Sequence, residues 1–288
     1  MNTPCVLALV LSAASFLAID MAPVAAQSAA VSDLGSQTHI HGLAVDRQDP
    51  KYLLIATHHG LFRAGPDGTA ERISPVQDFM GFNPHPSDSA KLYASGHPAE
   101  GGNLGFIASI DHGRTWEQIS PGADGPVDFH QMTVSPADPN TIYGAYGALQ
   151  VSRDAGKNWA AVGPLPDGLI DLAASAQDPG TLYAATEGGL SVSRNGGLTW
   201  ETILDGSPVS MVEVAPEGRL YAFVLGRGLR SAEEDALDFA IVSRDWGDRF
   251  LLHLAADPSD PARLFGATQQ GAILASVDGG KSWTGFGR

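Results

Sequence analysis

Residues 152–159 read SRDAGKNW, and this Ser-x-Asp-x-Gly-x-x-Trp pattern decides the fold because it recurs along the chain. Three other stretches match it, with Asp or Asn in the third place: SIDHGRTW at 109–116, SRNGGLTW at 193–200 and SVDGGKSW at 276–283. The closing tryptophans Trp116, Trp159 and Trp200 are separated by 43 and 41 residues, and Trp283 follows Trp200 after 83, about twice that period. A repeat of this length predicts an array of similar supersecondary units, with one degenerate copy near residue 240.

Each repeat has a second half, in which an apolar strand leads through an Asp-Pro turn to a strand that contains Leu/Ile-Tyr. Residues 132–143 (MTVSPADPNTIY) and 172–183 (LAASAQDPGTLY) are examples. Short alternating strands between turn residues at this period are typical of four-stranded propeller blades. Six copies can be counted, and they start near residues 39, 78, 128, 168, 208 and 250. The sequence therefore predicts an all-β fold, a single β-propeller domain of six four-stranded blades over residues 39–288.

The recurring motif resembles the BNR/Asp-box repeat of sialidase-like propellers, and the resemblance covers nearly all of the chain after residue 38. It implies structural turns in which Asp or Asn caps the turn, Gly takes a positive φ and Trp packs between blades. The residues expected in these roles are Asp111, Trp116, Asp154, Trp159, Asn195, Trp200, Asp278 and Trp283. Arg72-Ile73-Ser74 departs from the Phe/Tyr-Arg-Ile-Pro motif of the sialidases, which argues against sialidase activity.

The N-terminus and the composition predict an exported protein. An apolar run at residues 6–19 followed by small residues predicts a signal peptide over 1–26, and a leader over 27–38 follows it. Cys5 is the single cysteine, so cleavage would leave none for a disulfide or a thiolate metal site. The net charge of -15 disfavours nucleic acid and anionic lipid as partners. We therefore expect a periplasmic or secreted protein with no nucleic-acid partner, no nucleotide cofactor and no stable membrane insertion after cleavage.

Histidines and methionines gather at one predicted face of the ring. Because strands in a blade are antiparallel, the start of the first strand and the end of the second meet at one face, called here the top face. Seven of the 9 histidines fall there when the repeats are aligned. The candidate metal ligands are His39, His41, His58, His59, Met80, His97, His130 and Met132, and Asp78 and Asp128 could complete the set. His253 lies one place after its column and would join them only through a bulge.

Three functional hypotheses follow, and the sequence leaves all of them open. The first is binding of one transition metal ion, since imidazole with thioether favours copper and imidazole with carboxylate favours zinc; copper is the first expectation. The second is a glycoside hydrolase, which needs two carboxylates beside the scissile bond, with Asp78, Asp128 and Glu187 as candidates. The third is a non-catalytic scaffold. The expected partner is accordingly a metal ion, a small-molecule or glycan ligand, or another protein.

Overall fold

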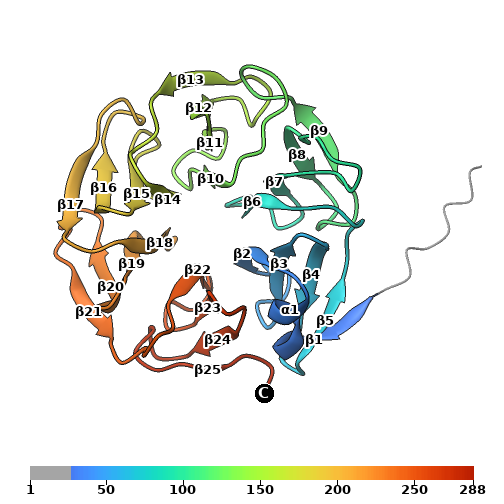
Figure 1. The fold of residues 1–288 in the computed structure, drawn as a ribbon, viewed down its shortest axis with the longest axis vertical. Coiled ribbons are helices and arrows are strands. Elements are labelled where there is room, and N and C mark those ends of the chain that lie inside the picture. Colours follow the sequence, from blue (N-terminus) through green and yellow to red (C-terminus); the bar gives the residue numbers. More distant parts are fainter. Residues whose placement is uncertain (1–26) are drawn as a thin grey trace, which may run out of the picture.

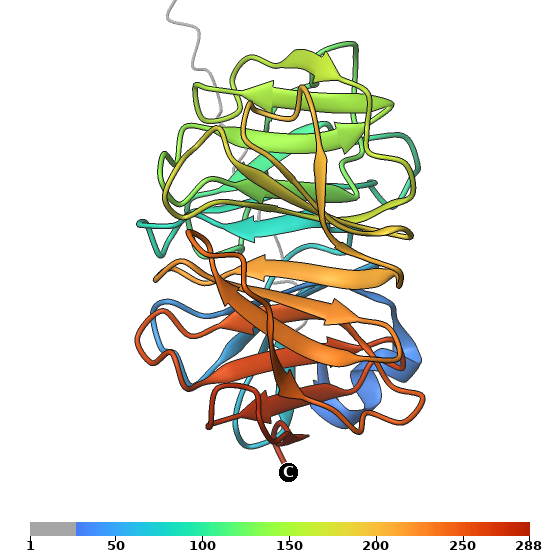
Figure 2. The same ribbon diagram turned by 90° about the vertical axis from the view of Figure 1, so that its left-hand side faces the viewer.

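A computed structural model describes residues 27–288 and shows that they form a ring of six antiparallel sheets. The predicted signal peptide lies outside the described residues. The sheets are arranged radially around the centre of the ring (Figure 1), where their first strands line a cavity, called here the central channel. Figure 2 shows the ring edge-on, with strands running across its thickness. The prediction of an all-β, six-bladed propeller is confirmed.

Each blade takes four strands that are consecutive in the sequence and hydrogen-bonded in that order. Blade one comprises β2 (Ile40–Val45), β3 (Leu53–Thr57), β4 (Gly60–Ala64) and β5 (Thr69–Arg72). Blade two comprises β6 (Met80–Pro84), β7 (Leu92–Ser95), β8 (Phe106–Ser109) and β9 (Glu117–Ser120). Blade three comprises β10 (Gln131–Val134), β11 (Ile142–Tyr146), β12 (Ala148–Ser152) and β13 (Ala160–Gly163). Blade four comprises β14 (Leu169–Ala174), β15 (Leu182–Thr186), β16 (Gly189–Ser193) and β17 (Glu201–Asp205). Blade five comprises β18 (Val209–Val214), β19 (Arg219–Val224), β20 (Gly228–Glu233) and β21 (Ala240–Ser243). Blade six comprises β22 (Leu251–Ala256), β23 (Leu264–Thr268), β24 (Ile273–Ser276) and β25 (Thr284–Gly285).

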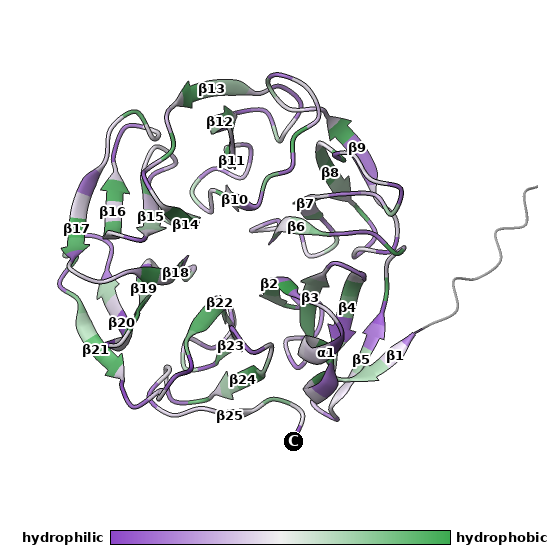
Figure 3. Cartoon of the chain, in the orientation of Figure 1, coloured by the Kyte–Doolittle hydropathy of each residue, from purple (hydrophilic) through white to green (hydrophobic). Residues whose placement is uncertain are grey.

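The hydrophobic core is divided among the junctions between neighbouring blades, because each sheet buries both of its faces. The second strands are almost wholly buried, whereas the fourth strands expose much of their length to solvent. Figure 3 shows apolar residues along strands such as β4 and β24. Leu54, Phe79 and Leu92, for example, join blade one to blade two. The motif tryptophan Trp116 packs at the same junction, with its ring centroid 4.7 Å from that of Phe79.

The ring closes between blade six and blade one, and the segment expected as a leader takes part in the closure. Strand β1 (Ser28–Ala30) pairs with β5 as a fifth strand, and the short helix α1 (Val31–Gln37) follows it. Val31 and Leu34 of α1 are buried in one cluster with Phe265 of blade six and Leu43 of blade one. Among residues 27–288, no helix is long and apolar enough to cross a membrane.

The four motif turns share the bonds made by their Ser and Asp or Asn side chains, and three of the four tryptophans, Trp200 being the exception, also donate an indole N–H to the motif glycine carbonyl. In residues 152–159, Asp154 accepts bonds from the backbone and side chain of Asn158, at 2.9 and 2.7 Å, and Gly156 has a φ of +84°. The Asn158 bonds lower the pKa of the exposed Asp154 carboxyl to about 2. Trp159 donates its indole N–H to the Gly156 carbonyl at 3.0 Å. None of the four capping Asp and Asn residues lines the channel, so they take no part in the site described below.

Candidate functional site

The central channel has a volume of about 940 Å³ and is lined by the first strands of all six blades. Two clusters of chemically similar side chains lie at its top end. Cluster one consists of His41, His58 and Asp78, and cluster two consists of His97, Asp128 and His130. In each cluster, two imidazole nitrogens and one carboxylate oxygen lie within 4.8 Å of one another. Six of the residues singled out from the sequence are thus brought together in two groups.

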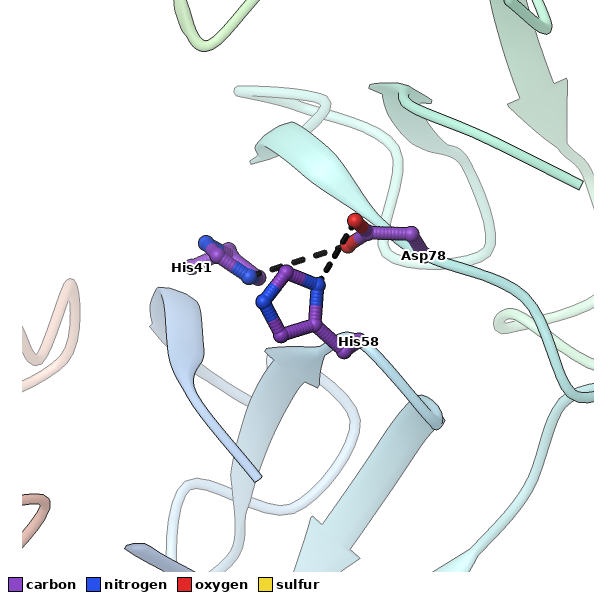
Figure 4. Close-up of side chains that lie close together, drawn as sticks. All are labelled: His41, His58 and Asp78. Carbon is purple, nitrogen blue, oxygen red and sulfur yellow. Dashed lines mark hydrogen bonds and ion pairs between the residues drawn. The ribbon is translucent and has the colours of Figure 1, made fainter. Parts of the chain in front are cut away.

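A bulge and a tight turn position the histidines of cluster one. In β2, Ile40 pairs with Thr57 and Gly42 pairs with Ala56, so His41 is the extra residue of a bulge. His58 follows β3 in the turn to β4, where the Thr57 hydroxyl donates to the Gly60 carbonyl at 2.9 Å. Gly60 has a φ of +122°, a conformation that residues with a side chain rarely adopt. Both imidazoles therefore reach the channel mouth from one blade (Figure 4).

Asp78 comes to cluster one from the next blade. Its segment precedes β6 and is bonded to the ends of two blades: the Asp78 N–H donates to the His97 carbonyl at 3.0 Å, and the Phe79 N–H donates to the Thr57 carbonyl at 3.2 Å. The ring of Phe79 is fully buried, which anchors the segment. The carboxylate of Asp78 consequently points back toward blade one (Figure 4).

Cluster one contains two buried polar atoms that face each other without a hydrogen bond. The Asp78 Oδ2 lies 2.7 Å from His58 Nδ1, a normal hydrogen bond. The Asp78 Oδ1 and His41 Nε2 are both buried, are 3.7 Å apart and have no hydrogen-bond partner among residues 27–288. Burial, followed by the charge of His58, lowers the pKa of His41 from 6.5 to about 3. The imidazole of His41 is therefore neutral at physiological pH, which is the form that binds metal ions.

Cluster two gathers around one carboxylate oxygen. The Asp128 Oδ2 lies 2.7 Å from His130 Nε2 and 2.8 Å from His97 Nε2. The hydrogen bond with Asp128 raises the pKa of His130, and the charge of Asp78 adds to that rise. The charge of His130 in turn contributes to the lowered pKa of His41. The two clusters are therefore close enough for their charges to interact.

Three other predicted ligands adjoin the clusters without joining them. His39 is exposed, and its ring centroid lies 5.3 Å from that of His58. Met80 and Met132 line the cavity but are buried, and Met132 packs in the core between blades two and three. His253 pairs with Ala267 just after a bulge in β22. This is the position that Gly42, and not His41, holds in blade one.

Three expectations about individual residues need correction. The bulge in β22 does not bring His253 into the His41 column, because β2 has the same bulge; His253 Nε2 instead lies 3.2 Å from the Ile40 carbonyl. His59 turns away from the channel and lines a separate depression of about 310 Å³ with Arg72. Glu187 is exposed in the β15–β16 turn and does not line the cavity, so it is not grouped with Asp78 and Asp128.

The sequence interpretation missed two carboxyls in the channel wall. Asp171 in β14 and Glu213 in β18 line the cavity, and the Asp171 carboxylate accepts the N–H groups of Leu172 and Val212, both at 2.9 Å. Burial raises the pKa of Asp171 to about 7 and, together with the Asp171 charge, that of Glu213 to about 8. A single carboxyl inside an apolar first strand, as in LIDLAA and VSMVEV, was the signal that could have revealed them.

Comparison with known proteins identifies the architecture of the chain but does not identify its activity. No family model matches the chain. A curated relative, a probable oligoxyloglucan-reducing end-specific xyloglucanase of Neosartorya fischeri, is 32% identical over an alignment of 157 positions that covers 45% of this chain and 19% of the relative. The chain therefore spans about a fifth of that relative's length. The match covers too little of either protein to assign the chain to a family.

Two solved structures illustrate the likeness of the fold. The GH74 xyloglucanase from Xanthomonas campestris superposes with a TM-score of 0.58 at 19% identity, over 90% of this chain and 46% of that enzyme. The protein YCF48 bound to D1 peptide superposes with a TM-score of 0.55 at 18% identity, over 94% of this chain and 88% of that protein. Identities this low show a shared fold alone. The chain is thus a six-bladed β-propeller, and its place in the sialidase-like branch stays a prediction.

Proposed function

We propose that this propeller binds a divalent transition metal ion, zinc in the first place, at cluster one. The observation that carries the proposal is a pair of buried atoms, His41 Nε2 and Asp78 Oδ1, which are 3.7 Å apart and find no hydrogen-bond partner within the described residues. A buried polar atom without a partner requires an explanation, and an ion is one. Zinc binds imidazole nitrogen and carboxylate oxygen at about 2.0–2.2 Å, so two of its ligands stand about 3.4 Å apart in a tetrahedral site. A zinc ion therefore fits between these two atoms after a small adjustment.

The donor set favours zinc over copper, contrary to our first expectation. Cluster one offers two imidazole nitrogens and one carboxylate oxygen, while the thioether of Met132 belongs to the core. Imidazole and carboxylate suit zinc, whereas a thioether would favour copper. Three protein ligands would leave a coordination position for water or a ligand from the channel. In the periplasmic or secreted location that the N-terminus predicts, such a site would store, sense or use the ion.

Zinc binding to an untagged, metal-free chain tests the proposal. At zinc concentrations about 100-fold above the Kd, binding to the folded state adds about 2.7 kcal/mol of stability. We therefore expect zinc to raise the Tm of the wild type. His58→Ala should remove most of that shift, because it deletes one donor. The matched control is His59→Ala, the neighbouring imidazole that faces another depression. No zinc-dependent shift in the wild type, or an equal shift in His58→Ala, contradicts the proposal.

The second candidate function is glycoside hydrolysis, and the comparisons support it better than they support metal binding. The relative from Neosartorya fischeri is named a xyloglucanase, and the solved GH74 enzyme shares the fold. Asp78 and Asp128 are the carboxyls that remain at the channel mouth. If they are the catalytic pair, the chain releases reducing sugar from xyloglucan oligosaccharides in EDTA, and Asp78→Asn and Asp128→Asn each reduce the rate at least 100-fold. Absence of turnover by the wild type rejects this candidate.

A scaffold without catalysis is the third possibility, and the likeness to a propeller bound to a peptide makes it testable. Binding of oligosaccharide or peptide without turnover, unaffected by zinc and by His58→Ala, would favour it over both other candidates.

A further inference from the structure

The two clusters share one arrangement of side chains, which occurs first between blades one and two and again between blades two and three. In each, a histidine just after the second strand of a blade meets an aspartate just before the first strand of the next blade. His58 meets Asp78 in this way at 2.7 Å, and His97 meets Asp128 at 2.8 Å. A phenylalanine with 0% exposure follows each aspartate, at Phe79 and at Phe129. The blade repeat therefore produces the same histidine–aspartate pair twice.

A third donor at the start of a first strand, in it or just before it, completes each pair, but the two clusters take this donor from different blades. In cluster one, His41 belongs to the blade that provides the histidine of the pair. In cluster two, His130 directly precedes β10 and comes from the blade that provides the aspartate. Both arrangements give two imidazoles and one carboxylate. The second set shares no side chain with the first, so it can hold a ligand of its own.

Hydrogen bonds orient His97 as metal-bound histidines are oriented. Its Nδ1 lies 2.7 Å from the Gly102 carbonyl, an acceptor, so Nδ1 carries a proton and donates it. In the neutral ring this leaves the lone pair on Nε2, the nitrogen that points at Asp128. A histidine that ligates a metal usually donates its other ring N–H to such a backbone carbonyl, which fixes the tautomer and the ring.

Asp128 provides the second sign that an ion belongs here. It has 5% exposure, and its Oδ1 is buried without a hydrogen-bond partner in the part of the chain that the structure describes, although Oδ2 is approached by two imidazoles. Leaving a buried carboxylate oxygen unpaired is costly in free energy. A cation beside the carboxylate would use that oxygen and would bring the two imidazole nitrogens to the same centre.

We infer that His97, Asp128 and His130 form a second, separate site for a divalent transition metal ion, so that the chain holds two ions at the channel mouth. The second ion is of the same class as that proposed for cluster one, but it has its own ligands. The two sites are neighbours, because the Asp78 N–H of cluster one donates to the His97 carbonyl of cluster two at 3.0 Å. A ligand in the channel mouth would meet both ions.

The stoichiometry of zinc binding tests this inference. Equilibrium dialysis of the untagged, metal-free, signal-cleaved chain against zinc should give two ions per chain. His58→Ala and His130→Ala alter imidazoles of comparable side-chain exposure, 43% and 55%, so both variants should fold. Each should keep one ion, the double variant should keep none, and His59→Ala should keep two. Asp128→Asn should reproduce the effect of His130→Ala if its circular dichroism spectrum is that of the wild type.

The possible outcomes separate this inference from the proposal for cluster one. One ion in the wild type that is lost in His58→Ala and kept in His130→Ala overturns the second site and leaves cluster one intact. One ion that is lost in His130→Ala and kept in His58→Ala supports the second site and overturns cluster one. One ion that is lost in either variant means a single shared centre and overturns the inference of two sites. No bound zinc in the wild type overturns both.

Discussion

The propeller is expected to lose about 3 kcal/mol of its unfolding free energy between pH 6.5 and pH 9, because two carboxyls in the channel wall hold protons in the folded state. Burial raises the pKa of Asp171 from 3.8 to about 7, and burial together with the Asp171 charge raises that of Glu213 from 4.5 to about 8. The guanidinium of Arg47 acts in the opposite direction on Glu213 and does not cancel the rise.

The sign follows from counting protons in the two states. At pH 6.5 the unfolded chain has released both protons, since the ordinary pKa values are far lower, whereas the folded chain largely retains them. Unfolding therefore releases protons, and raising the pH favours the unfolded state until both folded-state values are passed. The stabilising contribution is complete below pH 3.8 and is lost as the pH passes about 7 and then about 8. His41, with its pKa lowered to about 3, stays neutral above pH 6.5 in the folded chain.

Urea unfolding in EDTA at pH 6.5 and pH 9 measures the effect. The double variant Asp171→Asn/Glu213→Gln cannot lose these protons, so most of its pH dependence in this window should disappear. Asp178→Asn is the control, because that carboxyl caps an exposed turn and bonds to Thr181. If the double variant keeps the full pH dependence of the wild type, the two carboxyls are already ionised at pH 6.5.

The period of the motif was sufficient to predict the fold. Each Ser-x-Asp/Asn-x-Gly-x-x-Trp stretch encodes its own turn locally, through bonds such as that from the Asn158 backbone to Asp154. Its tryptophan then packs at the junction with the preceding blade, as Trp159 does against Phe106 of β8 and against Phe129, which lies just before β10. Local turns at a regular spacing leave few alternatives to a ring of similar sheets. The helix α1 was not predicted, because its seven residues carry no clear helical period.

The candidate site was predictable only as a set of columns. Strand alternation and antiparallel pairing place His41, His58 and His97 at the top face, but they do not say which side chains meet. The partners depend on the offset between blades, which pairs the histidine of one blade with the aspartate of the next. They also depend on bulges such as that at His41, which the sequence pattern does not mark. The offset between blades divided one expected cluster into two, and His59, in the turn between β3 and β4, faces a separate depression.

Gly156→Ala is expected to destabilise the propeller by about 3 kcal/mol or more, since backbone strain and a packing clash add together. Gly156 has a φ of +84°, where a residue with a Cβ is strained, typically by about 1–2 kcal/mol. An added Cβ would also overlap the ring of Phe106, which is fully buried between blades two and three. Overpacking against a fully buried ring typically costs about 1–3 kcal/mol, because neighbouring side chains or the backbone must shift. Chemical denaturation of the metal-free protein measures the loss.

Gly279→Ala separates the two contributions. Gly279 has a φ of +74°, but an added Cβ would have no atom within 4 Å. It corresponds in the last motif to Ala155, which already adopts a φ of +61° in this chain. Gly279→Ala should therefore cost about 1 kcal/mol, from backbone strain alone. If both variants lose the same stability, the packing of the motif glycine against the neighbouring blade contributes nothing, and the glycine is required only for the shape of its own turn.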